Sequence, residues 1–146
     1  GRSGAVTVKL FHGLRDRLDD VRLLSLHSGE LVGLANAFSK LSQAEEHNNL
    51  DLFRRIGRQL ADSGDAVGLQ GACVALNAFA QSSVRHEQLF FDLEERVPAW
   101  LHDPACTMRQ LAMLAHAHVR VGLSQSSLLP LIWDRARRLA QSAERR

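Results

Sequence analysis

Arginines gather in two short clusters of the sequence, and their chemistry indicates what the chain could bind. The clusters are Arg54, Arg55 and Arg58, and Arg135, Arg137 and Arg138. The guanidinium group is planar and always charged, and it binds phosphate or carboxylate through paired hydrogen bonds. Such clusters fit phosphate contacts along a nucleic-acid backbone. They fit equally well the solvated faces of two helices.

A second candidate is an asparagine that returns at one position of a short motif. Leu-Ala-Asn-Ala-Phe at 34–38 comes back as Ala-Leu-Asn-Ala-Phe at 75–79 and, more loosely, as Leu-Ala-His-Ala-His at 114–118. Asparagine is unfavourable inside a helix because its amide competes for backbone hydrogen bonds. The recurrence of Asn36 and Asn77 therefore indicates a task, either a hydrogen bond to a neighbouring helix or loop, or contact with the edge of a nucleic-acid base. His116 takes this position in the third copy and fits either task.

These residues lie in a repeat that dominates the sequence. Asn36 and Asn77 are 41 positions apart, and Asn77 and His116 are 39 apart. After each copy comes a second apolar pattern with helical spacing, beginning at Leu52, Leu89 and Leu128. Two helices in a period of roughly 40 residues are typical of an α-solenoid. The sequence thus predicts an all-α fold, with about three and a half helix-turn-helix repeats and no β-sheet.

The chain begins inside a repeat. Leu10, Phe11, Leu14 and Leu18 reproduce the second-helix pattern without a first helix before it. A half-repeat cannot bury its apolar stripe alone. We therefore expect residues 1–146 to be a single helical-repeat domain that is a segment of a longer protein.

Periodicity and capping signals predict the helix bounds. The expected helices cover about Val8–Asp20, Ser28–Leu41, Leu50–Asp62, Val67–Gln81, His86–Leu101, a segment from a Thr107–Gln110 capping box to Val121, and a last helix that starts at Ser126 or Ser127 and runs into the Arg-rich tail. Ser28 is the expected N-cap of the second helix. Pro98 is expected to end or bend its helix, and Gly122 to stop the sixth.

Charge is unevenly spread along the chain, whose net charge is +2. Residues 135–146 form an Arg-rich C-terminal tail, in which five arginines face one glutamate. The second helix of the second repeat is instead acidic, because Asp92, Glu94 and Glu95 are offset there only by Arg96. These acids interrupt a continuous basic track. They could pair with neighbouring arginines or with a basic protein partner.

Other residue classes indicate no chemistry of their own. The histidines form no metal-ligand set, and Cys73 and Cys106 form no metal or redox motif. Cys73, Phe38 and Phe79 are expected in the core, and Trp100 and Trp133 as packing residues or, if exposed, as interface or base-stacking residues. No catalytic constellation or phosphate-binding glycine loop is visible, and no run reaches the roughly 18 apolar residues of a membrane span. We expect no enzyme activity, no metal and no cofactor.

The repeated first helix and the Leu-Phe-x-x-Ile/Leu pattern of the second helix resemble the organellar helical-repeat proteins. These are the octotricopeptide and heptatricopeptide repeats and the repeats that precede RAP domains in FAST-kinase-like proteins. The resemblance covers about residues 9–140. It implies a right-handed α-solenoid, a mitochondrial location and RNA binding. Several such proteins are built into mitochondrial ribosomes.

Two functions follow as expectations. The first is a non-enzymatic RNA-binding repeat protein, a subunit of a mitochondrial ribonucleoprotein such as the ribosome, which contacts ribosomal RNA and neighbouring protein subunits. Arginines of both clusters would then contact phosphates, and Asn36, Asn77 and His116 bases or backbone. The alternative is a protein-binding α-helical scaffold subunit of a mitochondrial complex without RNA contact.

Overall fold

The computed structural model describes residues 23–44 and 50–144, and all regular structure in these ranges is helical. The elements are α3 (Ser28–Ala44), α4 (Leu50–Asp62), the 3-10 helix η1 (Gly64–Ala66), α5 (Gly68–Gln81), α6 (Glu87–Trp100), α7 (Met108–Arg120) and α8 (Leu128–Glu144). This confirms the all-α prediction and six of the seven expected helices. The expected helix at 8–20, with its half-repeat, lies outside the described residues.

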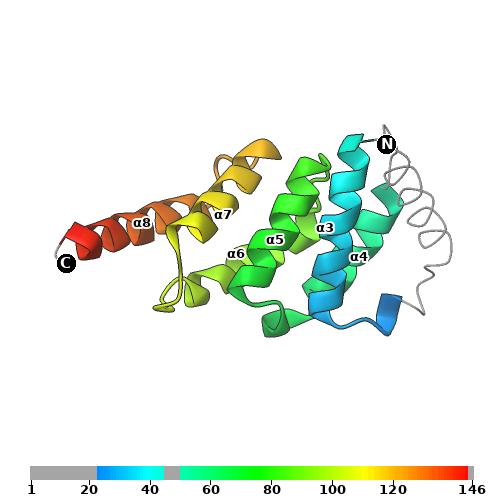
Figure 1. Cartoon of the computed structure of the whole chain (residues 1–146), viewed down its shortest axis with the longest axis horizontal. Coiled ribbons are helices and arrows are strands. Elements are labelled where there is room, and N and C mark those ends of the chain that lie inside the picture. Colours follow the sequence, from blue (N-terminus) through cyan, green and yellow to red (C-terminus); the bar gives the residue numbers. More distant parts are fainter. Residues whose placement is uncertain (1–22, 45–49, 145–146) are drawn as a thin grey trace.

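The helices form two layers, as Figure 1 shows. In the first layer α5 packs between α3 and α7, and in the second layer α6 contacts both α4 and α8. Each helix of the first layer also contacts the helix that follows it in the chain: α3 with α4, α5 with α6, and α7 with α8. The described chain is thus a row of three helix pairs, and its core lies between the layers.

The repeated sequence motif returns as repeated packing. Phe38 and Phe79 are buried, as predicted. Phe79 lies edge-on against Phe53 of α4, with ring centroids 5.0 Å apart. One pair further on, His118 takes the place of that phenylalanine and lies edge-on against Phe90, at 5.2 Å. The same aromatic contact therefore joins successive helix pairs.

The ends of α5 and α7 are built alike. The amide of Val84 donates to the carbonyl of Phe79, and the amide of Leu123 donates to the carbonyl of His118. A hydrogen bond between residues five apart at the C-terminal end of a helix is accompanied by a left-handed backbone conformation at the residue just before the donor. That residue is Gly122 (φ 83°), as predicted, and Ser83 (φ 58°), which adopts the conformation without being glycine.

Several caps agree with the sequence and one does not. Thr107 and Gln110 form the predicted capping box of α7. At α8 the Ser126 hydroxyl accepts from the Leu128 amide. The prediction of Ser28 as the α3 cap is wrong. His27 does this instead, because its Nδ1 accepts from the Glu30 amide while the Glu30 carboxylate accepts from the His27 amide, both at 3.2 Å.

Two further helix features differ from or refine the expectations. Pro98 does not end its helix, since α6 continues past it to Trp100. The Arg-rich tail is helical over most of its length, because α8 extends to Glu144. Pro130 lies in the first turn of α8, where a helix tolerates proline.

The start of α6 packs against α4 where the His86 ring lies over Gly57. The His86 ring caps α6 and also reaches the carbonyl of Arg54. It lies directly over Gly57, where a β-carbon would come within 2.4 Å of the ring. Glycine at this position therefore permits the close approach of α6 to α4.

Candidate nucleic-acid interface

The arginines of α4 divide into two that reach solvent and one that does not. Arg54 and Arg58 are exposed and lie one helical turn apart. Arg55, between them, is half-buried, and its Nε lies 3.2 Å from a carboxylate oxygen of Asp51. Arg54 and Arg58 are therefore the members of this cluster that could meet a phosphate backbone.

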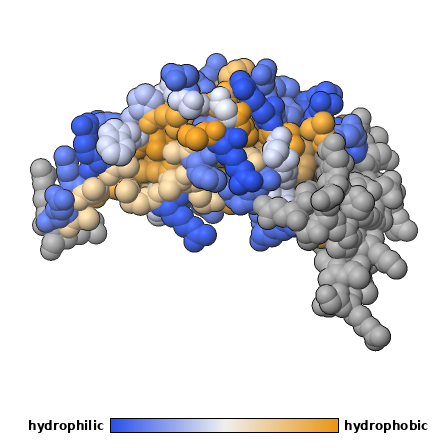
Figure 2. Space-filling view, turned by 90° about the horizontal axis from the view of Figure 1, so that it is seen from above, coloured by the Kyte–Doolittle hydropathy of each residue, from blue (hydrophilic) through white to orange (hydrophobic). Residues whose placement is uncertain are grey.

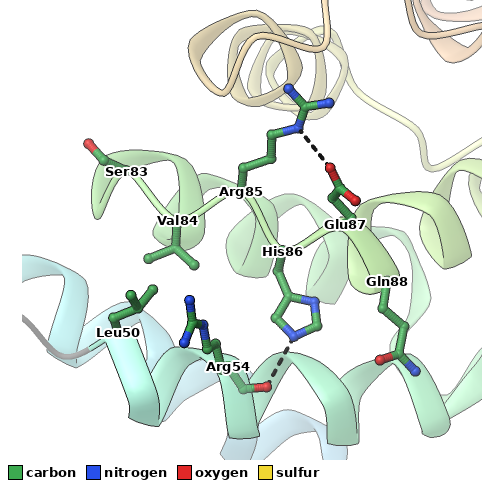
Figure 3. Close-up of a pocket in the computed structure, with 8 residues that line it drawn as sticks. All are labelled: Leu50, Arg54, Ser83, Val84, Arg85, His86, Glu87 and Gln88. Carbon is green, nitrogen blue, oxygen red and sulfur yellow. Dashed lines mark hydrogen bonds and ion pairs between the residues drawn. The ribbon is translucent and has the colours of Figure 1, made fainter.

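A cleft of about 390 Å³ lies beside Arg54, between the start of α4 and the loop that leads into α6. Its lining adds a second arginine, Arg85, which the sequence analysis did not select. Figure 3 shows the guanidinium of Arg85 turned away from Arg54 and toward Glu87, whose carboxylate lies 3.8 Å away. The two guanidinium groups therefore do not converge on one small anion. Arg54 and Arg85 instead provide two separate positive charges at the rim of the cleft.

The histidine in this cleft is held in one tautomer. His86 Nδ1 accepts from the Leu89 amide at 3.1 Å, so its Nε2 carries the proton and donates to the Arg54 carbonyl at 3.0 Å. With both ring nitrogens engaged, His86 is fixed in place. Its two hydrogen bonds hold the loop that contains Arg85 beside α4.

The arginines of α8 are partly neutralised within the chain. Arg137 and Arg138 both bind the carboxylate of Asp134, at 2.8 and 2.9 Å. Arg135 donates to the Asp103 carbonyl at 3.4 Å. Arg137 and Arg138 remain exposed at the surface. Their shared carboxylate reduces the charge they offer to a ligand.

Between α4 and α8, the acids of α6 are largely occupied inside the chain. Arg96 binds Asp92 of its own helix and Asp65 of η1, as expected for acids that pair with neighbouring arginines. Glu94 instead accepts from the hydroxyls of Ser127 (2.6 Å) and Ser126 (3.0 Å). These hydrogen bonds, with that of Ser127 the strongest, hold the pKa of the Glu94 carboxyl below its ordinary value. Glu95 is exposed.

The recurrent Asn/His position belongs to the other layer. Asn36 and Asn77 are half-buried on α3 and α5, and His116 is exposed on α7. Within the described residues neither asparagine amide makes the interhelical hydrogen bond that was one of its two expected tasks. The predicted site residues thus divide between the two layers rather than forming one cluster.

Basic residues of the first layer were missed by the sequence analysis. Lys40, Arg109 and Arg120 are exposed on the same helices as Asn36 and His116. The sequence of α5 contains no charged residue, and α7 contains no carboxylate. The sequence does contain a signal for this basic surface: α5 and α7, the first helices of the second and third helix pairs, both lack acidic residues.

Of the other residues that the sequence singled out, Cys73 and Trp100 belong to the core or pack against it, whereas Trp133 is exposed. Cys73 is buried, donates to the Gln110 carbonyl, and has its pKa raised by burial to about 12. Trp100 packs against the core, as predicted. Trp133 does not, since it is 70% exposed.

No group of His, Cys, Asp and Glu that could hold a metal ion occurs in the described ranges. The helices described there are all too short or too polar to cross a membrane. Comparisons with protein-family models, with curated proteins and with solved structures found no match.

Proposed function

We propose that this chain is a non-enzymatic helical-repeat protein that binds RNA, as a subunit of a mitochondrial ribonucleoprotein such as the mitochondrial ribosome. The observation that carries RNA contact is the exposed pair Arg54 and Arg58, one turn apart, with Arg85 on the adjoining loop. Arginines spaced along a rim suit successive phosphates of a strand. The location and the class of RNA rest on the sequence resemblance.

The finer fold belongs to the same proposal. We infer a right-handed α-solenoid that extends the row of helix pairs. Two observations support it: the equivalent aromatic contacts Phe53–Phe79 and Phe90–His118, and the equivalent left-handed helix ends at Ser83 and Gly122. In such a repeat each pair contacts only its neighbours, which leaves long surfaces for a ligand.

Replacing Arg54 and Arg58 together with glutamine is expected to weaken binding to single-stranded RNA by about tenfold, because two phosphate contacts are lost. The dependence of log K on log salt should flatten by roughly 1.4, at about 0.7 per phosphate. Fluorescence anisotropy at several salt concentrations measures both quantities.

The matched control replaces the same two residues with lysine. Lysine keeps the charge, so the salt dependence should stay near that of the wild type while the paired hydrogen bonds of arginine are lost. Unchanged RNA affinity in the glutamine variant would eliminate α4 as the phosphate-binding helix.

A protein-binding scaffold without RNA contact is the second candidate. The observation that favours it is apolar surface: Met108, Val119 and Trp133 are each more than half exposed. An apolar interface changes little with salt, so the same titration separates the two functions.

A further inference from the structure

The helices of the first layer share a face that turns away from the second layer, here called the outer face. From Ala72 onward, the residues of α5 that are not buried are Val74, Asn77 and Gln81, which follow one another at helical spacing. Because α3 and α7 pack against α5, this stripe runs along the middle of the outer face. The equivalent positions, 41 residues earlier on α3 and 39 later on α7, include Asn36, Lys40, His116 and Arg120, and Arg109 begins the α7 stripe.

Carboxylates are nearly absent from the helices that build the outer face. Together α3, α5 and α7 contain only Glu30, whose carboxylate accepts from the His27 amide at the start of α3. The second-layer helices have the same total length and contain eight carboxylates: Asp51, Asp62, Glu87, Asp92, Glu94, Glu95, Asp134 and Glu144. The exposed cations of the outer face are Lys40, Arg109 and Arg120, and their own helices supply almost nothing to neutralise them.

These three cations are too far apart for one small anion. Arg109 and Arg120 are 11 positions apart on α7, which is about 16 Å along the helix. Ser39, beside Lys40, donates to Gln81 at the end of α5, so the ends of α3 and α5 lie level. Lys40 and Arg120 are therefore separated by two helix spacings, about 16–20 Å. A nucleic-acid strand spans such distances, whereas a free phosphate does not.

Neutral hydrogen-bonding groups lie between the cations. The amides of Asn36 and Asn77 are half-buried and the His116 ring is exposed, all at equivalent positions of the three helices. In nucleic-acid interfaces arginine and lysine contact phosphates, and amide side chains also contact phosphate and sugar oxygens. An acidic protein surface would pair with the cations alone. The mixture of cations and amides favours a nucleic acid.

We propose that the outer face binds a second segment of RNA while Arg54 and Arg58 hold a first, so that the chain bridges two RNA segments. This inference rests on the proposed function. Arg54 and Arg58 belong to α4 in the second layer, and Figure 2 shows strongly hydrophilic residues on both long sides of the row. A helix pair added at either end of the row would lengthen both faces rather than cover them.

The test counts the copies of an oligouridine of about 10 nucleotides that bind one full chain, by native mass spectrometry. We expect two copies on the wild type. Lys40→Gln, Arg109→Gln and Arg120→Gln, combined as the outer-face variant, should weaken one site at least tenfold and leave one copy bound. The salt dependence of that site should flatten by roughly 2, at about 0.7 per phosphate. Arg54→Gln with Arg58→Gln should remove the other copy.

The matched control carries Arg109→Lys and Arg120→Lys, which keep the charge, and it should still bind two copies. A wild type that binds one copy, lost only in the Arg54/Arg58 variant, would overturn bridging and leave the proposed function intact. One copy lost only in the outer-face variant would overturn both bridging and the α4 site. Absence of any bound RNA would overturn the proposed function itself. Polyglutamate bound to the outer face beside a single RNA would assign that face to an acidic protein and also overturn bridging.

Discussion

Replacing Gly57 with alanine is expected to lower the free energy of unfolding by about 1–3 kcal/mol. The added β-carbon would lie 2.4 Å from Cδ2 of the His86 ring. The ring cannot turn aside cheaply, because the Leu89 amide and the Arg54 carbonyl hold its two nitrogens. Relief therefore requires α6 to move away from α4. Urea unfolding followed by circular dichroism measures the loss.

Gly33 provides the matched control. It also lies inside a helix, but a β-carbon there would meet no atom within 4 Å. Gly33→Ala should stabilise the protein by roughly 0.5–1 kcal/mol, through helix propensity alone. In a His86→Ala background, Gly57→Ala should lose most of its cost. A Gly57→Ala variant as stable as Gly33→Ala would contradict the close packing of His86 on α4.

Replacing His118 with phenylalanine is expected to stabilise the protein by about 1 kcal/mol at neutral pH. The His118 side chain is fully buried; its Nδ1 donates to the Leu114 carbonyl at 2.8 Å, and its Nε2 has no hydrogen-bond partner. Leaving a buried acceptor unpaired costs about 1–3 kcal/mol. Phe38 and Phe79 already occupy the equivalent positions in the preceding pairs, which indicates that the site suits this ring.

The same substitution should remove a pH dependence of stability. Burial lowers the pKa of His118 below its ordinary value of 6.5, against weaker opposing effects of the Leu114 carbonyl and Glu94. Just below pH 6.5 the unfolded chain thus binds more protons at this residue than the folded chain. The free energy of unfolding should fall as pH falls from 6.5 toward the lowered pKa, by at most about 1.4 kcal/mol per pH unit.

Urea unfolding of the wild type and of His118→Phe, between pH 7.5 and 5, measures this difference. His116→Gln is the control, because His116 is exposed two positions away on the same helix. We expect the control to keep the wild-type slope below pH 6.5 and His118→Phe to lose it. Equal slopes in all three proteins would mean that His118 is not a buried neutral imidazole.

Much of the fold could be predicted because its signals are local. Helical periodicity and the Thr107–Gln110 box are readable within one turn, and Gly122 is suited to a left-handed helix end. The missed features depend on tertiary structure. His27 and His86 cap helices through ring orientations that propensity does not describe, and Ser83 adopts a positive φ without glycine. Gly57 lies inside the predicted helix 50–62, and nothing in the local sequence indicates that His86, 29 positions later, packs directly over it.

The candidate site was less predictable for a similar reason. Spacing puts Arg54 and Arg58 on one helix face, but the burial of Arg55 beside Asp51 depends on how α4 packs. The pairing of Arg137 and Arg138 with Asp134 could be anticipated from their spacing on a helix. The exposure of Trp133 could not, since an apolar stripe does not reveal whether another helix covers it.

RNA contact is tested most directly by ultraviolet cross-linking of the native complex, with mass spectrometry of the nucleotide-bearing peptides. The proposed function predicts adducts on peptides that contain Arg54 to Arg58 or Arg85, and it allows them near Asn36, Asn77, His116 and the α8 arginines. A well-recovered chain without nucleotide adducts, but with protein–protein cross-links along its surface, would contradict RNA binding and favour the scaffold.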